Sequence, residues 1–218
     1  GVRLVGSEMC IRDRDNALIR ENFQRNFALK KLHEVNDNDL ILINDLDEIP
    51  ELKNFSYKKK ITIFKQRMLY FKFNLVYKNL SWTGSKICKK KDLISPQWLR
   101  NIKTRKYPLW RLDIFFSKKK YNNIEIIENG GWHFTNIKTA DEIHHKMKSF
   151  LHHFEYENSG LNPEMIEKLI KDKKALYNYN ADQRDNKWSN NSELEKINLE
   201  FLPDYINENL DKYQNWLS

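Results

Sequence analysis

Three acidic side chains follow directly on a short apolar run in the segment LILINDLDEIP, which spans residues 40–50. The run predicts a buried strand over residues 40–43, and Asp45, Asp47 and Glu48 come at its end. Because side chains alternate along an extended backbone, we expect Asp45 and Asp47 to point to the same side. Two carboxylates so placed can hold Mn²⁺ or Mg²⁺ and leave coordination positions for water and a diphosphate. A solvated turn is the alternative interpretation.

A second pair of acids, Asp37 and Asp39, has the same spacing at the opposite end of this strand. Open α/β sheets bind ligands beyond the carboxyl ends of their strands. The earlier pair is therefore expected to form a turn, and the later pair is the candidate site.

The elements that would position these acids follow from periodicity and caps. The first helix carries an apolar stripe of Ile19, Phe23 and Phe27, with Leu29 and Leu32 nearby, which we expect to be buried. Thr139 and Glu142 form a capping box before another helix, whose buried row would be Ile143, Met147, Leu151 and Phe154. The predicted helices cover residues 15–32, 139–158, 163–176 and part of 202–217; the predicted strands cover 40–43, one or two segments of 61–77, a segment of 81–93 and the run before Gly130–Gly131. This alternation predicts an α/β fold in one domain.

The composition fits a packed protein with a basic surface. The chain has 218 residues, of which 40% are hydrophobic, and a formal net charge of +8 that comes mainly from lysine clusters. No apolar run approaches the ~18 residues of a membrane-spanning helix, and no secretory leader opens the chain. We therefore expect a cytoplasmic location, with a peripheral contact at the inner membrane surface left open.

The first fourteen residues, GVRLVGSEMCIRDR, show no helical or strand period. They resemble a translated sequencing adapter, so we expect residues 1–14 to be non-native and residues 15–218 to be a partial domain. Without this segment Cys88 is the remaining cysteine, which excludes an intrachain disulfide.

The segments QRN (residues 24–26), NDLDEIP (residues 44–50) and GGWHF (residues 130–134), in this order, resemble the family 17 glycosyltransferases, which include the β-1,4-N-acetylglucosaminyltransferases that add the bisecting sugar to N-glycans. The similarity extends from about the first helix to LPDYI near the end. It implies a GT-A type fold, a Rossmann-like mixed sheet flanked by helices, here without its first strands. It also implies a UDP-sugar donor, UDP-GlcNAc by analogy, a Mn²⁺ or Mg²⁺ ion and a glycan acceptor, with no nucleic acid among the partners.

The resemblance also implies roles for particular residues. Asp45 and Asp47 match the motif for the metal and the diphosphate, and His133 is a candidate third ligand. Gly130 and Gly131 would let the backbone approach the donor, and Arg25 could contact a phosphate. For His133 the alternative is a structural imidazole, and for Arg25 it is helix capping or core support. The chain departs from the family pattern in SFLHHFE, residues 149–155.

The implied reaction inverts the sugar carbon and needs a carboxylate that takes the proton of the acceptor hydroxyl. Glu48 is the first candidate for this base, and Glu128 and Glu155 are the others. Surface solubility is the alternative explanation for each of them.

Two other functions are left open. The pattern of apolar strand and D-x-D is also typical of Mg²⁺-dependent aspartyl phosphatases, in which the first Asp is the nucleophile. The lysine clusters with neighbouring aromatic residues would also suit a non-enzymatic, basic binding domain.

Overall fold

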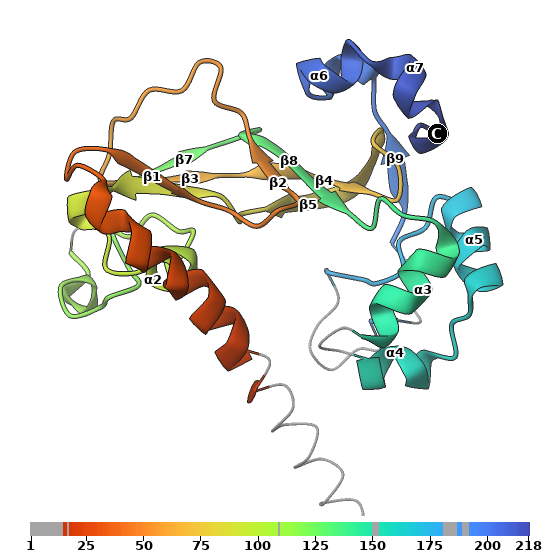
Figure 1. The fold of residues 1–218 in the computed structure, drawn as a ribbon, viewed down its shortest axis with the longest axis horizontal. Helices are drawn as coiled ribbons and strands as arrows, with labels where there is room; N and C mark the ends of the chain where they lie inside the picture. Colours follow the sequence, from red (N-terminus) through yellow and green to blue (C-terminus); the bar gives the residue numbers. More distant parts are fainter. Residues whose placement is uncertain (1–14, 17, 109, 150–152, 181–186, 189–191) are drawn as a thin grey trace, which may run out of the picture. The chain divides into compact units, whose positions relative to one another are not determined.

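The computed structural model describes residues 15–16, 18–108, 110–149, 153–180, 187–188 and 192–218 (Figure 1). Contacts divide the chain into two compact units, and each is assembled from two stretches of the sequence. Unit 1 comprises residues 1–65 and 83–130, and unit 2 comprises residues 66–82 and 131–218. Both are mixed α/β structures with a mixed sheet, so the α/β prediction is confirmed at this level.

Unit 1 contains a four-stranded sheet in the order β1-β6-β3-β7. Its strands are β1 (Leu40–Ile43), β6 (Lys86–Lys89), β3 (Ile61–Phe64) and β7 (Ile124–Ile127). β6 pairs antiparallel with both β1 and β3, whereas β3 and β7 are parallel. The short strand β2 (Glu48–Pro50) follows β1.

The core of unit 1 lies between this sheet and helix α2 (Pro96–Asn101). Ser95 caps α2 by accepting a hydrogen bond from the backbone N–H of Trp98, and Pro96 occupies the first turn, where its missing N–H costs nothing. Trp98 and Leu99 pack on Ile61 and Ile63 of β3. The remaining short elements are three 3₁₀ turns, η1 (Ala28–Glu34), η2 (Lys90–Asp92) and η3 (Leu112–Ile114).

The sheet of unit 2 contains β8 (Gly131–Thr135), β4 (Gln66–Tyr70), β5 (Leu75–Trp82) and β9 (Leu194–Lys196). β8 and β4 are parallel, while β5 pairs antiparallel with β4 and with β9. Alternation along β4 places Met68 and Tyr70 in one apolar cluster and Leu69 in another. Unit 2 therefore has a core on each face of its sheet.

The helices of unit 2 divide between these two cores. α3 (Ala140–Lys148) and α5 (Pro163–Lys171) pack in the larger one, and α4 (His153–Ser159) lies beside α3 (Figure 1). The last stretch of the chain covers the other core with η4 (Leu199–Phe201), α6 (Asp204–Asn207), α7 (Leu210–Tyr213) and η5 (Gln214–Trp216).

Several predicted elements are confirmed. β1 has the predicted bounds, and both hydrogen bonds of the capping box at Thr139 and Glu142 are present. Ile143 and Met147 are buried as expected. Leu151 and the side chain of Phe154, which complete the predicted row, lie outside the described residues.

Other predicted elements need correction. The helix predicted over residues 139–158 is two helices, because α3 ends at Lys148. The terminal helix is likewise divided into short turns. The first helix does form over residues 18–27, but its stripe is exposed: Ile19, Phe23 and Phe27 are 64%, 69% and 52% accessible.

Cys88 is buried in the core of unit 1, and burial raises the pKa of its thiol to about 12. None of the helices described is long and apolar enough to span a bilayer.

An acidic turn held by two arginines

Asp45 and Asp47, at the end of β1, lie in a tight turn that leads into Glu48, the first residue of β2. The N–H of Glu48 donates to the carbonyl of Asp45 at 3.1 Å, and Leu46 and Asp47 at the tip are exposed. The carboxylate of Glu48 reaches back and accepts from the N–H of Asp45 at 3.0 Å. These reciprocal hydrogen bonds close the turn, so the expectation that Asp45 and Asp47 share one side of a strand loses its basis.

Arg100 of α2 binds two carboxylates of this turn. Its Nη1 donates to both oxygens of Glu48, at 3.0 and 2.8 Å, and its Nη2 donates to Oδ2 of Asp45 at 2.7 Å. The side chain of Glu48 has no exposed surface, and that of Arg100 is 12% exposed. A buried carboxylate is stable only with such a partner, so Arg100 fixes the conformation of the turn.

Arg25, on the first helix, binds the other side of Asp45. Its Nε and Nη2 lie 3.3 and 3.2 Å from Oδ1, and its Nη1 donates to Gln97 at 3.0 Å. Both oxygens of Asp45 therefore accept from arginine. The structure brings together Arg25, Asp45 and Glu48, which the sequence had singled out separately.

Two further residues make room for Glu48 and position Arg100. Gly84 faces the Glu48 carboxylate so closely that an added Cβ would lie 1.6 Å from Oε1. Lys86 is buried and donates to the carbonyls of Arg100 and Ile102, at 2.6 and 2.7 Å, at the end of α2. Burial, and then the nearby Arg100, lower the pKa of Lys86 to about 8.

A divalent cation fits this turn in a limited way. In the part of the chain that the structure describes, no three His, Cys, Asp or Glu side chains are grouped as ligands. Mg²⁺ and similar ions, however, keep several waters and are commonly bound through one or two carboxylates together with substrate phosphates. Asp47 is exposed at the tip of the turn, where a hydrated cation can reach its carboxylate. Asp45 is bound to two guanidinium groups.

Gly130 ends the loop between β7 and β8, and Gly131 is the first residue of β8. Gly130 is buried, and an added Cβ would lie 3.0 Å from the carbonyl oxygen of Ile127 and 3.1 Å from Phe64. Gly131 has a φ of 127°, a conformation that favours glycine. Close packing accounts for Gly130, and backbone conformation accounts for Gly131. Glu128 in the same loop is exposed and forms an ion pair with Lys65 at 2.9 Å.

His133 lies in unit 2, on β8. The residue is 7% exposed, and its ring stacks on Trp82, with centroids 4.6 Å apart and planes at 10°. Its Nδ1 is 3.1 Å from Oγ1 of Thr135. Glu155 is exposed on α4.

Sequence reasoning missed Arg100, Gly84 and Lys86. The Ser95–Pro96 pair is a helix-start signal that was not used, and nothing in the sequence joins Arg100 to carboxylates more than fifty residues earlier. Gly84 carried a weaker signal, since an isolated glycine beside a strand often marks a close approach.

Comparisons with family models, with curated proteins and with solved structures find no match to this chain.

Proposed function

We propose that the chain is part of a metal-dependent, inverting glycosyltransferase of GT-A type. It would transfer a sugar, taken to be N-acetylglucosamine from UDP-GlcNAc, to a glycan acceptor. The observation that carries this proposal is the acidic turn at the carboxyl end of β1, where Asp47 is exposed at the tip and the partly exposed Arg25 is paired with Asp45. The ordered motifs that resemble family 17 glycosyltransferases support it.

Each residue of the turn has a part in this proposal. Asp47 would bind the cation together with the donor diphosphate, with Asp45 as a further ligand. Arg25, 25% exposed, would contact a phosphate oxygen. The cation would stabilise the charge that develops on the leaving diphosphate. To bind the cation, Asp45 would have to give up hydrogen bonds to Arg25 and Arg100.

The base that takes the acceptor proton is a separate question. A general base must come within hydrogen-bond reach of that hydroxyl. Glu48 is fully buried and bound through both oxygens to Arg100, which favours a structural role. Glu128 and Glu155 are exposed, and we propose that the base is one of these two.

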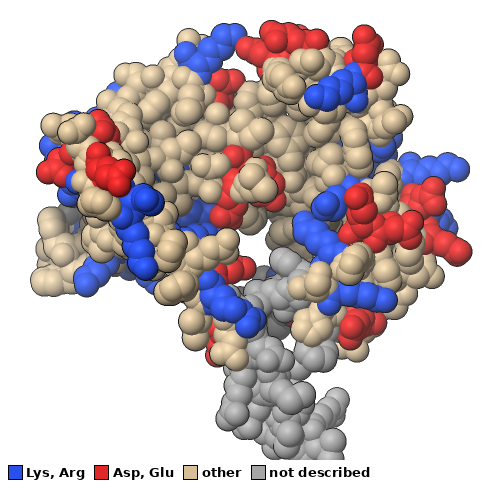
Figure 2. Space-filling model, in the orientation of Figure 1, with Lys and Arg blue, Asp and Glu red and all other residues tan. Residues whose placement is uncertain are grey.

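Two alternatives receive less support from the geometry. In an aspartyl phosphatase Asp45 would be the nucleophile, yet both of its oxygens accept hydrogen bonds from arginine. For a basic binding domain the positive charge should be gathered on one surface. On the face drawn in Figure 2, Lys and Arg side chains are interspersed with Asp and Glu.

Donor hydrolysis tests the proposal. The wild-type chain is incubated with UDP-GlcNAc and Mn²⁺, and release of UDP is measured, with a generic phosphate ester in a parallel reaction. Release of UDP that needs Mn²⁺ and falls about tenfold or more in Asp47→Asn is expected. Asp37→Asn is the matched control, because Asp37 belongs to the pair at the other end of β1 and is exposed. Phosphate release from the ester, without UDP release, would instead indicate the phosphatase.

A further inference from the structure

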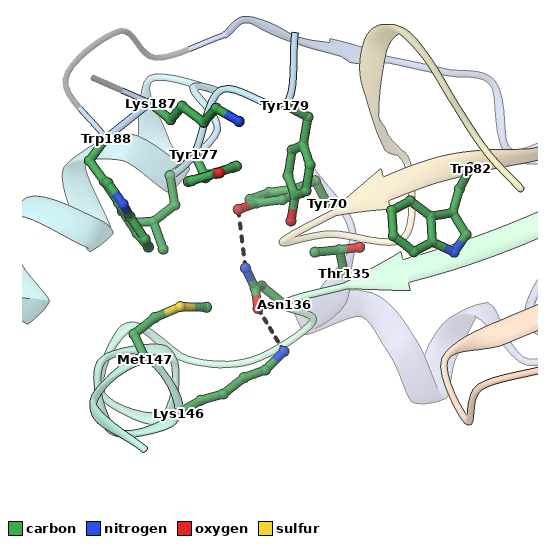
Figure 3. Close-up of a pocket in the computed structure, with 11 residues that line it drawn as sticks. Tyr70, Trp82, Thr135, Asn136, Lys146, Met147, Tyr177, Tyr179, Lys187 and Trp188 are labelled. Atoms are coloured by element: carbon green, nitrogen blue, oxygen red, sulfur yellow. Dashed lines mark hydrogen bonds between the residues drawn. The ribbon is translucent and has the colours of Figure 1, made fainter. Parts of the chain in front are cut away.

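Unit 2 contains a pocket of about 410 Å³ at the carboxyl ends of the parallel strands β4 and β8 (Figure 3). Tyr70 ends β4, Thr135 ends β8, and both line the pocket together with Asn136. The volume falls in the ~300–1,000 Å³ range of small-molecule sites. The carboxyl ends of parallel strands are also where α/β sheets bind ligands.

The residue that follows each of these two strands has an unusual backbone conformation. Phe71, after β4, has a φ of 64°, and Asn136, after β8, has a φ of 53°. The N–H of Phe71 donates to the carbonyl of Thr135 at 3.1 Å, which joins the two exits. A positive φ is uncommon for a bulky residue such as Phe71, and such strained residues cluster at ligand sites.

Asn136 supplies the polar floor of the pocket. It is 5% exposed, and its Nδ2 donates to the hydroxyl of Tyr70 at 3.1 Å, while its Oδ1 accepts from Nζ of Lys146 at 3.0 Å. Figure 3 shows Asn136 between these two partners. Burial holds the pKa of Tyr70 well above its ordinary value, so its hydroxyl keeps its proton.

The walls of the pocket are largely aromatic. Tyr177 packs edge-on against Tyr179, with ring centroids 4.9 Å apart, and against Trp188 at 5.1 Å. Among the residues that the structure describes, five aromatic residues line the pocket: Tyr70, Trp82, Tyr177, Tyr179 and Trp188. Aromatic faces offer broad contact area to the apolar face of a flat ligand.

The charged side chains among the described residues that line the pocket are all basic. Among the eleven described residues around the pocket are Lys146 and Lys187, and none of the eleven is an acid. The Nζ of Lys187 lies 5.7 Å from the ring centroid of Tyr177, so a cation stands beside the aromatic wall. This combination favours a ligand that has both a ring and a negative charge.

We infer that the pocket binds a pyranose ring with an anionic substituent, a carboxylate or a phosphate. The ring would pack on the aromatic wall, its hydroxyls would bond to Asn136 and Thr135, and the anion would meet Lys187 and Lys146. The choice of a sugar, as the terminal residue of the acceptor, rests on the proposed function. The acceptor is then an acidic glycan.

Ligand-observed NMR titration of the full chain, without donor or metal, tests this inference. The probes are glucuronic acid, glucose 6-phosphate and glucose. We expect at least one of the two acids to bind about tenfold more tightly than glucose, and the tighter one identifies the substituent. Lys187→Gln should remove this preference, whereas Lys168→Gln, which removes the same charge from an exposed position on α5, should leave it unchanged.

A second variant tests the contribution of the aromatic wall of the pocket. Tyr179 is 36% exposed, so Tyr179→Ala should fold and should weaken the sugar acid several-fold. Equal binding of glucose and the acids, or binding by none of the three, would overturn the inference. Loss of the preference for the acids in Lys168→Gln, to the same extent as in Lys187→Gln, would also overturn it. Because these titrations need no donor, their failure leaves the UDP-release test intact, and a failure of that test leaves these titrations intact.

Discussion

Glu48 shows how one buried carboxylate sets the backbone around it. Its oxygens accept from the N–H of Asp45 and from Arg100, so a residue that the sequence suggested as a base holds the turn together. The space that it occupies exists because residue 84 is glycine. The structural role of Glu48 can therefore be tested by substituting Gly84 and measuring stability, without an assay of activity.

Gly84→Ala should destabilise the chain by about 3 kcal/mol, because the new Cβ would displace the Glu48 carboxylate from its buried partner. Urea unfolding measures the change. Gly160→Ala is the control: its Cβ meets open space, and its cost comes from a φ of 69° alone, about 1 kcal/mol. Equal costs for the two variants would contradict this account of Glu48.

Lys86 gives the second prediction at this scale. Burial and the nearby Arg100 lower its pKa from 10.5 to about 8 in the folded chain. Between these values the unfolded chain binds more protons, so the contribution of Lys86 to the free energy of unfolding rises with pH there and is constant below pH 8. The rise should amount to about 2–3 kcal/mol.

Urea unfolding at several pH values across this window, for the wild-type chain and for Lys86→Met, measures this contribution. The wild-type chain should gain stability relative to the variant as the pH rises. A difference between the two that does not change with pH would show that Lys86 titrates normally.

At the scale of single elements, periodicity and caps predicted local structure well. β1 has its predicted bounds, and Thr139 caps α3 as expected, because both signals lie within a few residues of the element they define. The same periodicity predicted a helix over residues 15–32, of which residues 18–27 are helical, but it assigned the apolar stripe of this helix to a core. A hydrophobic period shows which residues share a face, but it does not show that another element covers that face.

The exposed stripe leads to a third prediction. Phe23 is 69% accessible, so Phe23→Ser should change the free energy of unfolding by less than about 1 kcal/mol. Met68→Ala on β4, where the side chain is fully buried, should cost about 2–5 kcal/mol. Thermal or urea unfolding compares the two, and a cost for Phe23→Ser close to that of Met68→Ala would show that the helix face is packed in solution.

For the whole molecule, the α/β class was predictable but the candidate site was only partly so. Asp45 could be singled out by its position after a strand, whereas the turn that holds it depends on Arg100, 55 residues later. The pocket in unit 2 could not be predicted from the sequence, because no sequence pattern indicates the left-handed conformations of Phe71 and Asn136. Long-range pairs and backbone strain are properties of the folded chain.

The central claim is that Asp47 binds a metal together with a nucleotide diphosphate. Calorimetry of UDP binding, with and without Mn²⁺, tests it most directly in the wild-type chain, Asp47→Asn and Asp37→Asn. The account predicts UDP binding that requires Mn²⁺, that persists in Asp37→Asn and that weakens by about tenfold or more, at least 1.4 kcal/mol, in Asp47→Asn. Equal Mn²⁺-dependent affinity in all three proteins, or binding of UDP that does not depend on Mn²⁺, would contradict it.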